Sequence, residues 1–155
     1  HNYHTFNMAV KSMVVMRKAF RTIDAKVSET FKEFNLTPTQ FGVMDMLNAK
    51  GRMKISELID CMLATSGNMT VVIKNMEKKG MIILRCQPSN KKNKYIHLTD
   101  TGKQLIDSIM VPLVKAEEQA LGMLTTQEQD VLLPLLQKYA NALNTTIGKI
   151  TRKEK

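Results

Sequence analysis

The sequence predicts a mostly α-helical fold that carries a small β-hairpin wing, the arrangement of a winged helix-turn-helix. Three observations predict it: two short amphipathic segments lie close together between residues 55 and 79, two strand-like runs follow at once, and long helical patterns occupy both ends of the chain. A length of 155 residues fits one domain. We therefore expect a single domain over 1–155, with 36–98 as its winged region.

The N-terminal pattern predicts one long amphipathic helix. Apolar residues recur there at steps of three and four: Phe6, Val10, Met13, Met16, Phe20, Ile23, Val27, Phe31 and Phe34. This stripe is longer than a compact monomer of this size needs, so a helix of a second subunit is a plausible cover for it. Leu36, Thr37 and Pro38 end the pattern.

The C-terminal pattern predicts two more helices. Thr99 can cap the first, and Pro112 inside its apolar pattern predicts a kink or a break. Thr125 and Glu128 have the spacing of a capping box and open the last helix, which Pro134 should bend.

Between these ends, three short helices and a hairpin are expected. Thr37 caps a helix that Gly51 stops, a second follows over 55–62, and a third runs from about Ser66 to Gly80. The segments 81–86 and 94–98 are strand-like, and the polar segment 87–93 between them predicts the tip of the wing.

The helix that starts near Ser66 has the two faces that a major-groove helix requires. Its inward positions are Met69, Val72, Ile73 and Met76, while Gly67, Val71, Lys74 and Lys78 point away and Asn68 and Thr70 lie on the flanks. Such a helix can be held on one side and enter the groove with the other. A solvated helix face is the alternative.

Each outward residue then has an expected role on DNA. Ser66, Gly67, Asn68 and Thr70 stand at the helix N-terminus, where N–H groups and the helix dipole favour a phosphate. Asn68 could pair with an adenine edge and Val71 could touch a thymine methyl group. Lys74 and Lys78 are expected to hold phosphates.

The wing adds positive charge. Lys91, Lys92 and Lys94 lie at its tip and Arg85 on its first strand, where they could reach a minor groove or the flanking backbone; the alternative is a solubilising loop. The net charge of the chain is +9, and residues 50–103 carry eleven basic against four acidic residues. Such clustering indicates a polyanion, first nucleic acid and second an anionic membrane surface.

Other classes of site find less support in the sequence. No window approaches 18 apolar residues and no secretory signal is evident, so a cytoplasmic protein without a membrane partner is expected. Cys61 and Cys86 have no metal or redox spacing and are expected to be small buried thiols, with a redox-sensing thiol as the alternative. We find no basis for a metal site, a cofactor or an enzyme.

The chain resembles the MarR family of bacterial regulators over nearly its whole length. Four segments carry the resemblance: 36–41 (LTPTQF), 55–58 (ISEL), 76–82 (MEKKGMI) and 98–102 (LTDTG). The resemblance implies dimerisation through helices in 1–35 and 99–148, binding of palindromic operators in double-stranded DNA, and release by a small ligand or an oxidant. Residues 64–70 are similar to the branch that responds to phenols and quinones.

Two positions depart from the family pattern. The family usually has Asp and Arg at the wing tip, where this chain has Asn90, Lys91 and Lys92, and Lys lacks the planar fork of Arg. Many relatives have a basic residue where Val71 stands. The sequence thus predicts a sequence-specific DNA-binding transcriptional regulator that acts as a repressor. The alternatives are a winged-helix module that docks an acidic protein partner and an RNA-binding winged helix.

Overall fold

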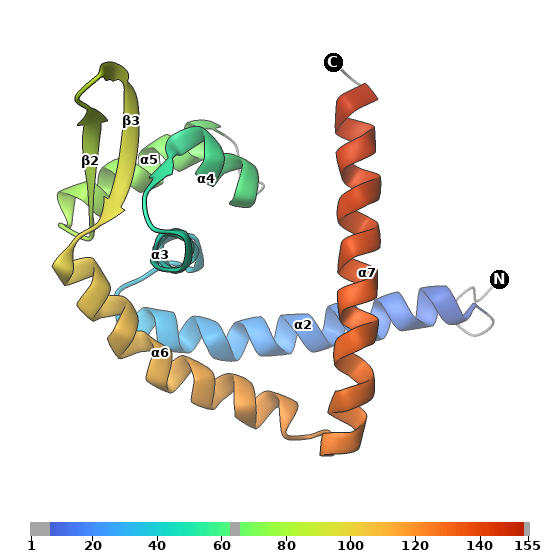
Figure 1. Cartoon of the computed structure of the whole chain (residues 1–155). Helices are drawn as coiled ribbons and strands as arrows, with labels where there is room; N and C mark the ends of the chain where they lie inside the picture. Colours follow the sequence, from blue (N-terminus) through green and yellow to red (C-terminus); the bar gives the residue numbers. More distant parts are fainter. Residues whose placement is uncertain (1–6, 63–65, 154–155) are drawn as a thin grey trace. The chain divides into compact units, whose positions relative to one another are not determined.

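A computed structural model describes residues 7–62 and 66–153, apart from the side chains of Ser66, 91–93 and 144–153. The chain forms two compact units, 1–116 and 117–155, and each is described by itself. The elements in chain order are α2 (Met8–Glu33), α3 (Pro38–Lys50), β1 (Met53–Lys54), α4 (Ile55–Met62), α5 (Ser66–Lys78), β2 (Ile82–Gln87), β3 (Asn90–Leu98), α6 (Asp100–Leu121) and α7 (Thr126–Lys153) (Figure 1). The predicted mixture of many helices and one hairpin is confirmed.

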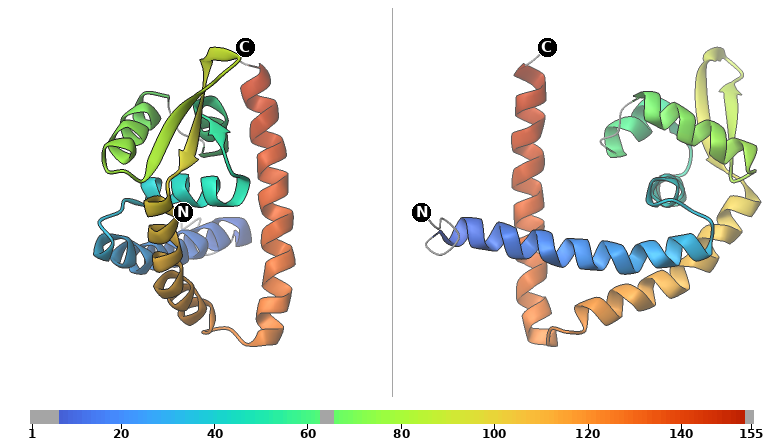
Figure 2. Two further views of the ribbon diagram at one scale, coloured as in Figure 1. Left: turned by 60° about the vertical axis from the view of Figure 1, so that its left-hand side comes forward. Right: turned by 180° about the vertical axis from the view of Figure 1, so that it is seen from behind.

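The sheet is antiparallel, with the strand order β1-β3-β2. The tip of its β2–β3 hairpin projects past α5 (Figures 1 and 2). The sheet differs from the expectation in two ways. Strand β3 begins at Asn90, so the loop is much shorter than the predicted 87–93, because a projecting hairpin needs no apolar side chains to pair its backbones. Strand β1 was not predicted, since two residues show no periodicity.

The helix boundaries follow from local chemistry. Thr37 and Gln40 form a reciprocal capping box at the start of α3, with 3.1 Å between donor and acceptor in both bonds. Thr125 and Glu128 do the same at the start of α7, at 3.2 and 2.8 Å. Gly51 ends α3 with a φ of 77°, a conformation that suits glycine. The predicted caps are therefore confirmed.

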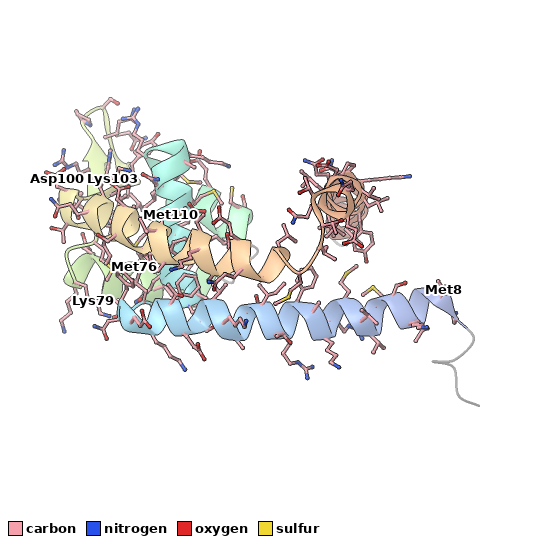
Figure 3. The ribbon with its side chains drawn as sticks, turned by 90° about the horizontal axis from the view of Figure 1, so that it is seen from below. Met8, Met76, Lys79, Asp100, Lys103 and Met110 are labelled. Carbon is pink, nitrogen blue, oxygen red and sulfur yellow. The ribbon has the colours of Figure 1, made fainter. Side chains whose placement is uncertain are left out.

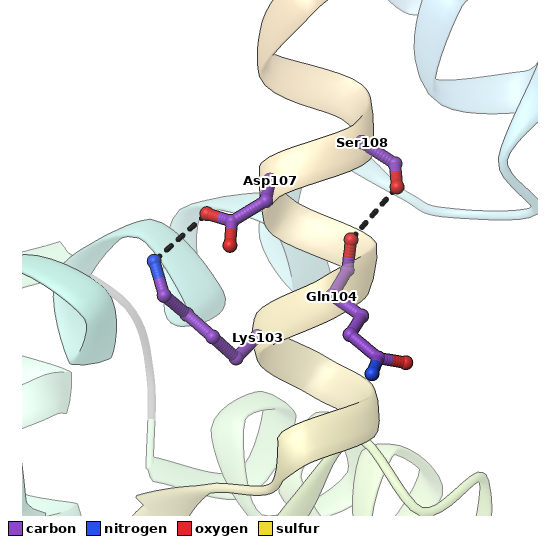
Figure 4. Close-up of polar contacts among 4 residues, drawn as sticks. All are labelled: Lys103, Gln104, Asp107 and Ser108. Atoms are coloured by element: carbon purple, nitrogen blue, oxygen red, sulfur yellow. Dashed lines mark hydrogen bonds and ion pairs between the residues drawn. The ribbon is translucent and has the colours of Figure 1, made fainter.

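Pro112 lies inside a continuous α6, so the expected alternative of a break there is wrong. Proline removes only the hydrogen bond to the carbonyl group four residues earlier, and the bonds on either side keep the helix together. Two polar contacts lie on the exposed side of the helix before it: Lys103 pairs with Asp107 at 2.8 Å, and the Ser108 hydroxyl donates to the Gln104 carbonyl (Figure 4).

The core of the first unit collects the inward residues of the short helices, the sheet and α6. Its most buried members are Val43, Met44, Leu58, Met69, Ile73, Met76, Ile82, Ile96, Ile106 and Ile109. The rings of Phe31 and Phe41 stack at 4.8 Å between centroids, which joins the end of α2 to α3. Met110 packs against this core, whereas Asp100 and Lys103 at the start of α6 are exposed (Figure 3).

Thr99 joins three elements of the winged region. Its hydroxyl donates to the Gly80 carbonyl at 2.6 Å and accepts the N–H of Gly102 at 3.0 Å, while its own N–H donates to the Met81 carbonyl at 3.1 Å. One residue thus caps α6 and ties it to the end of α5 and the start of β2. The orientation of the hairpin relative to α5 depends on this junction.

Helix α7 dominates the second unit and leaves apolar residues exposed. Val131, Leu133 and Leu135 are 65, 59 and 58% exposed, and Leu136, Tyr139 and Leu143 are exposed as well. A hollow of about 510 Å³ lies against this surface, lined by Leu124, Gln127, Glu128, Val131, Leu132 and Leu135. In the described part of the chain, no helix has the length and hydropathy needed to cross a bilayer.

Candidate nucleic-acid interface

Helix α5 has one buried and one exposed face, as its pattern predicts. Met69, Ile73 and Met76 are at most 2% exposed and fix the helix to the core. On the opposite side Val71 is 59% exposed, and Lys74 and Lys78 are exposed with it. The predicted orientation of this helix is therefore confirmed, and a valine outside the core marks its outward face.

The first turn of α5 is open. Gly67, Asn68 and Thr70 are exposed, and a Cβ placed on Gly67 would meet no atom of the described residues within 4 Å. Packing among the described residues therefore gives no reason for a glycine at this position. A surface without side-chain bulk at a helix N-terminus lets another backbone or a phosphate approach closely.

The far end of α5 is fixed to the wing. Gly80 has a φ of 74°, its N–H donates to Glu77, and the N–H of Met81 donates to Met76, the two bonds of a Schellman motif. The Glu77 carboxylate also accepts the N–H of Leu84 on β2 at 3.3 Å. These bonds hold the helix and the hairpin at a set angle to each other.

The sheet register places two predicted wing residues on opposite faces. Arg85 pairs with Tyr95, whereas Lys94 pairs with Cys86 one step along the hairpin, and successive side chains of a strand alternate. Both Arg85 and Lys94 are exposed. The hairpin therefore presents positive charge on both of its faces. The side chains of Ser66, Lys91 and Lys92 lie outside the described residues.

Four residues on the outer face of the sheet were not predicted from the sequence: Arg52, Lys54, Tyr95 and His97. The Arg52 guanidinium lies 5.0 Å and the Lys54 ammonium 5.8 Å from the centroid of the Tyr95 ring. The fourth is His97, whose pKa is lowered below its usual range by burial first, and then by the positive charges of Arg85 and Arg52. The one available signal was the alternation of basic and apolar residues in 52–55, which is too short to identify a strand.

Both cysteines are exposed, so the expectation of small buried thiols is wrong. Cys61 lies at the polar edge of the short helix α4, and the Lys50 ammonium donates to its sulfur at 3.5 Å. Cys86 lies on the wing two residues beyond Leu84, the half-buried partner of the buried Ile96. Burial is decided here by where the core ends, which the spacing of two cysteines does not reveal.

Comparison with known proteins identifies relatives of the whole arrangement. A family model described as "MarR family" matches residues 36–94. The "Uncharacterized HTH-type transcriptional regulator YkoM" of Bacillus subtilis is 32% identical over 124 residues, which are 80% of this chain and 80% of that protein. The "HTH-type transcriptional regulator MhqR" of the same species is 23% identical over 84% of this chain and 90% of its own length.

Solved structures share the fold. A mutant MarR from Escherichia coli complexed with operator DNA superposes with a TM-score of 0.75 at 20% identity, over 87% of this chain and 97% of that one. A structure of BpsR from Bordetella bronchiseptica, described as a mechanism for regulation of its DNA binding by 6-hydroxynicotinic acid, has a TM-score of 0.73 at 21% identity. It covers 84% of this chain and 98% of that one.

Proposed function

Since the chain belongs to the MarR family of DNA-binding transcriptional regulators, we propose that it is a repressor that binds a palindromic operator as a homodimer. The observation that carries the proposal is α5: a helix buried on its methionine and isoleucine side presents Gly67, Val71 and Lys74 to the outside. That surface is small, apolar at one point and basic, which suits the major groove.

On this proposal, each residue of the interface has a distinct task. The open first turn of α5, from Ser66 to Thr70, receives a phosphate and brings Asn68 to a base edge. Val71 touches a thymine methyl group. Lys74 and Lys78 hold backbone phosphates and fix the register.

The wing contacts the backbone on both sides of its hairpin. Arg85 and Lys94, exposed on opposite faces, are placed to reach phosphates on the two sides of a groove into which the tip extends. Lys91 and Lys92 supply the charge of the tip itself.

Dimerisation through the terminal helices is part of the proposal. Val131, Leu135, Tyr139 and Leu143 recur every four residues along α7 and are all exposed. A stripe of this kind is stable in water only when another helix covers it. A second copy of the chain supplies a matching stripe, and two copies of α5 then meet the two halves of a palindrome.

Release from DNA is assigned to a small aromatic effector, of the phenol or quinone class. The similarity of residues 64–70 to the branch that responds to such compounds supports this, as does the regulation of BpsR by an aromatic acid. An oxidant acting on the exposed Cys61 or Cys86 is the second route that fits the proposal.

Selection of bound duplexes from a random pool tests the proposal, followed by titration of the selected operator at two salt concentrations. The full chain should enrich an inverted repeat and bind it with a steep dependence on salt. The double variant Lys74→Ala, Lys92→Ala should weaken operator and random DNA alike, and Lys103→Gln serves as the control because it removes one positive charge at an exposed position outside the assigned surface.

Unchanged affinity of the folded double variant at low salt would refute the assigned surface. Preference for structured RNA, or for an acidic protein over any duplex, would refute the proposed function. Tests with phenols, quinones and peroxides on the operator complex then identify the releasing agent.

A further inference from the structure

The outer face of the sheet carries a compact group of positive side chains around one ring. We call Arg52, Lys54, Arg85, Tyr95 and His97 the sheet patch. Lys54 and Arg85 flank Tyr95 from the strands on either side of β3, because both are paired with it in the register. Arg52 lies one residue before β1 and reaches over the same ring.

The positive charges of the sheet patch have no ion-pair partner among the residues that the structure describes, although Arg52 lines a hollow together with Glu57 and Asp60. Glu57 is near in sequence, but its carboxylate accepts the N–H of Lys54 at 2.9 Å and so acts as a helix cap. Cations held close together repel one another, and an anion placed among them would remove that repulsion.

The Tyr95 ring orders the side chains of Arg52 and Lys54 through cation–π contacts. Arg52 at 5.0 Å and Lys54 at 5.8 Å are both within the range of a cation–π contact. Side chains that are already ordered lose less conformational entropy when they bind. His97 lies in the field of the same group, since the charges of Arg85 and Arg52 help to lower its pKa.

We propose that the sheet patch binds backbone phosphates of duplex DNA, beside the segment that α5 and the wing tip contact. The inference rests on the proposed function. Arg85 already belongs to that interface, and the sheet patch continues from it across the hairpin to β1. An arginine, a lysine and a second arginine around one ring suit the repeated single charges along a phosphate backbone.

The decisive variant is Arg52→Gln, Lys54→Gln in the full chain, titrated with the operator from the pool selection. Loss of two phosphate contacts should lower the log–log salt slope by about two units and weaken binding roughly a hundredfold at about 50 mM salt. Lys103→Gln, a paired lysine, should leave both unchanged. A slope equal to that of the parent protein would overturn the inference.

The two hypotheses fail separately. If the parent protein binds no duplex, the proposed function fails; if the parent binds and the double variant matches it, only the sheet patch is refuted. Urea unfolding of each variant confirms that the chain is folded before its affinity is compared.

Two substitutions of Tyr95 test whether its ring positions Arg52 and Lys54 or only fills space. Tyr95→Phe keeps the ring and should keep the affinity, whereas Tyr95→Leu keeps apolar volume and should lose about threefold in affinity and part of the slope. Equal binding by Tyr95→Leu and Tyr95→Phe would contradict the role of the ring.

The pKa of the His97 imidazole should show whether DNA occupies the sheet patch. Titration of its NMR signals should show a higher pKa with operator DNA bound than without it, because phosphates offset the charges of Arg85 and Arg52. A glutamate-rich peptide should leave the pKa unchanged. A shift with the peptide and none with DNA would overturn the proposal in favour of an acidic protein partner.

Discussion

The backbone of Met81 touches the first turn of α6 at Gly102, and no side chain fits between them. A Cβ on Gly102 would collide with the Met81 carbonyl oxygen and lie 3.0 Å from the carbonyl carbon. The same carbonyl accepts the N–H of Thr99. The segment Leu98–Gly102, which resembles the family pattern, thus closes the joint between α5, the wing and α6.

Gly102→Ala should therefore destabilise the protein, by about 3 kcal/mol, because the opposing group is backbone and can move only with the hairpin. Urea unfolding measures the change. A cost below about 1 kcal/mol would show that the joint yields to a methyl group.

Gly67→Ala should instead keep the stability of the protein and weaken its binding to the operator. A Cβ at this position meets no described residue, and alanine is the better helix former, so the free energy of unfolding should stay equal or rise by about 0.5 kcal/mol. Binding to the operator should fall about tenfold or more, because the methyl group would occupy the space that the DNA backbone needs. A stable variant that binds like the parent protein would remove this contact from the interface.

Thr99→Val should cost about 1–2 kcal/mol, since it leaves the Gly80 carbonyl without its donor and the Gly102 N–H without its cap. Thr99→Ser keeps the hydroxyl and should recover most of the loss. Unfolding curves of the three proteins are compared at one pH. Equal stability of the valine and serine variants would mean that these bonds contribute little.

Asn68→Ala and Lys74→Ala should affect different properties of DNA binding, namely sequence preference and overall affinity. Removing the amide should change which operator bases are preferred, while removing the ammonium should weaken all duplexes by a similar factor and flatten the salt dependence. Competition binding with single-base operator variants measures both effects. An unchanged preference profile for Asn68→Ala would exclude a base contact by that side chain.

The free energy of unfolding should fall in mild acid, because protonation of His97 is less favourable in the folded protein. Its folded pKa is lowered by burial and by Arg85 and Arg52, so the unfolded chain binds the proton more tightly. The contribution is complete above the ordinary pKa of about 6.5 and declines as the pH falls from there toward the folded value. His97→Gln should unfold with a smaller pH dependence between pH 7.5 and 5, and identical pH profiles would contradict this assignment.

The sequence by itself determined the local elements and the faces of α5. Periodicity assigned Met69, Ile73 and Met76 to the core, and Thr37, Gly80 and Thr125 carried the helix boundaries, because these signals act within a few residues. It also determined that the positive charge gathers in the winged region.

Only the tertiary structure decided how distant segments meet. The two-residue strand β1 exists because β3 offers it an edge, and that pairing alone brings Arg52 and Lys54 to Tyr95. The exposure of Cys61 and Cys86 likewise depends on where the core ends. Such relations depend on contacts between residues far apart in the chain, so no local pattern of residue types records them.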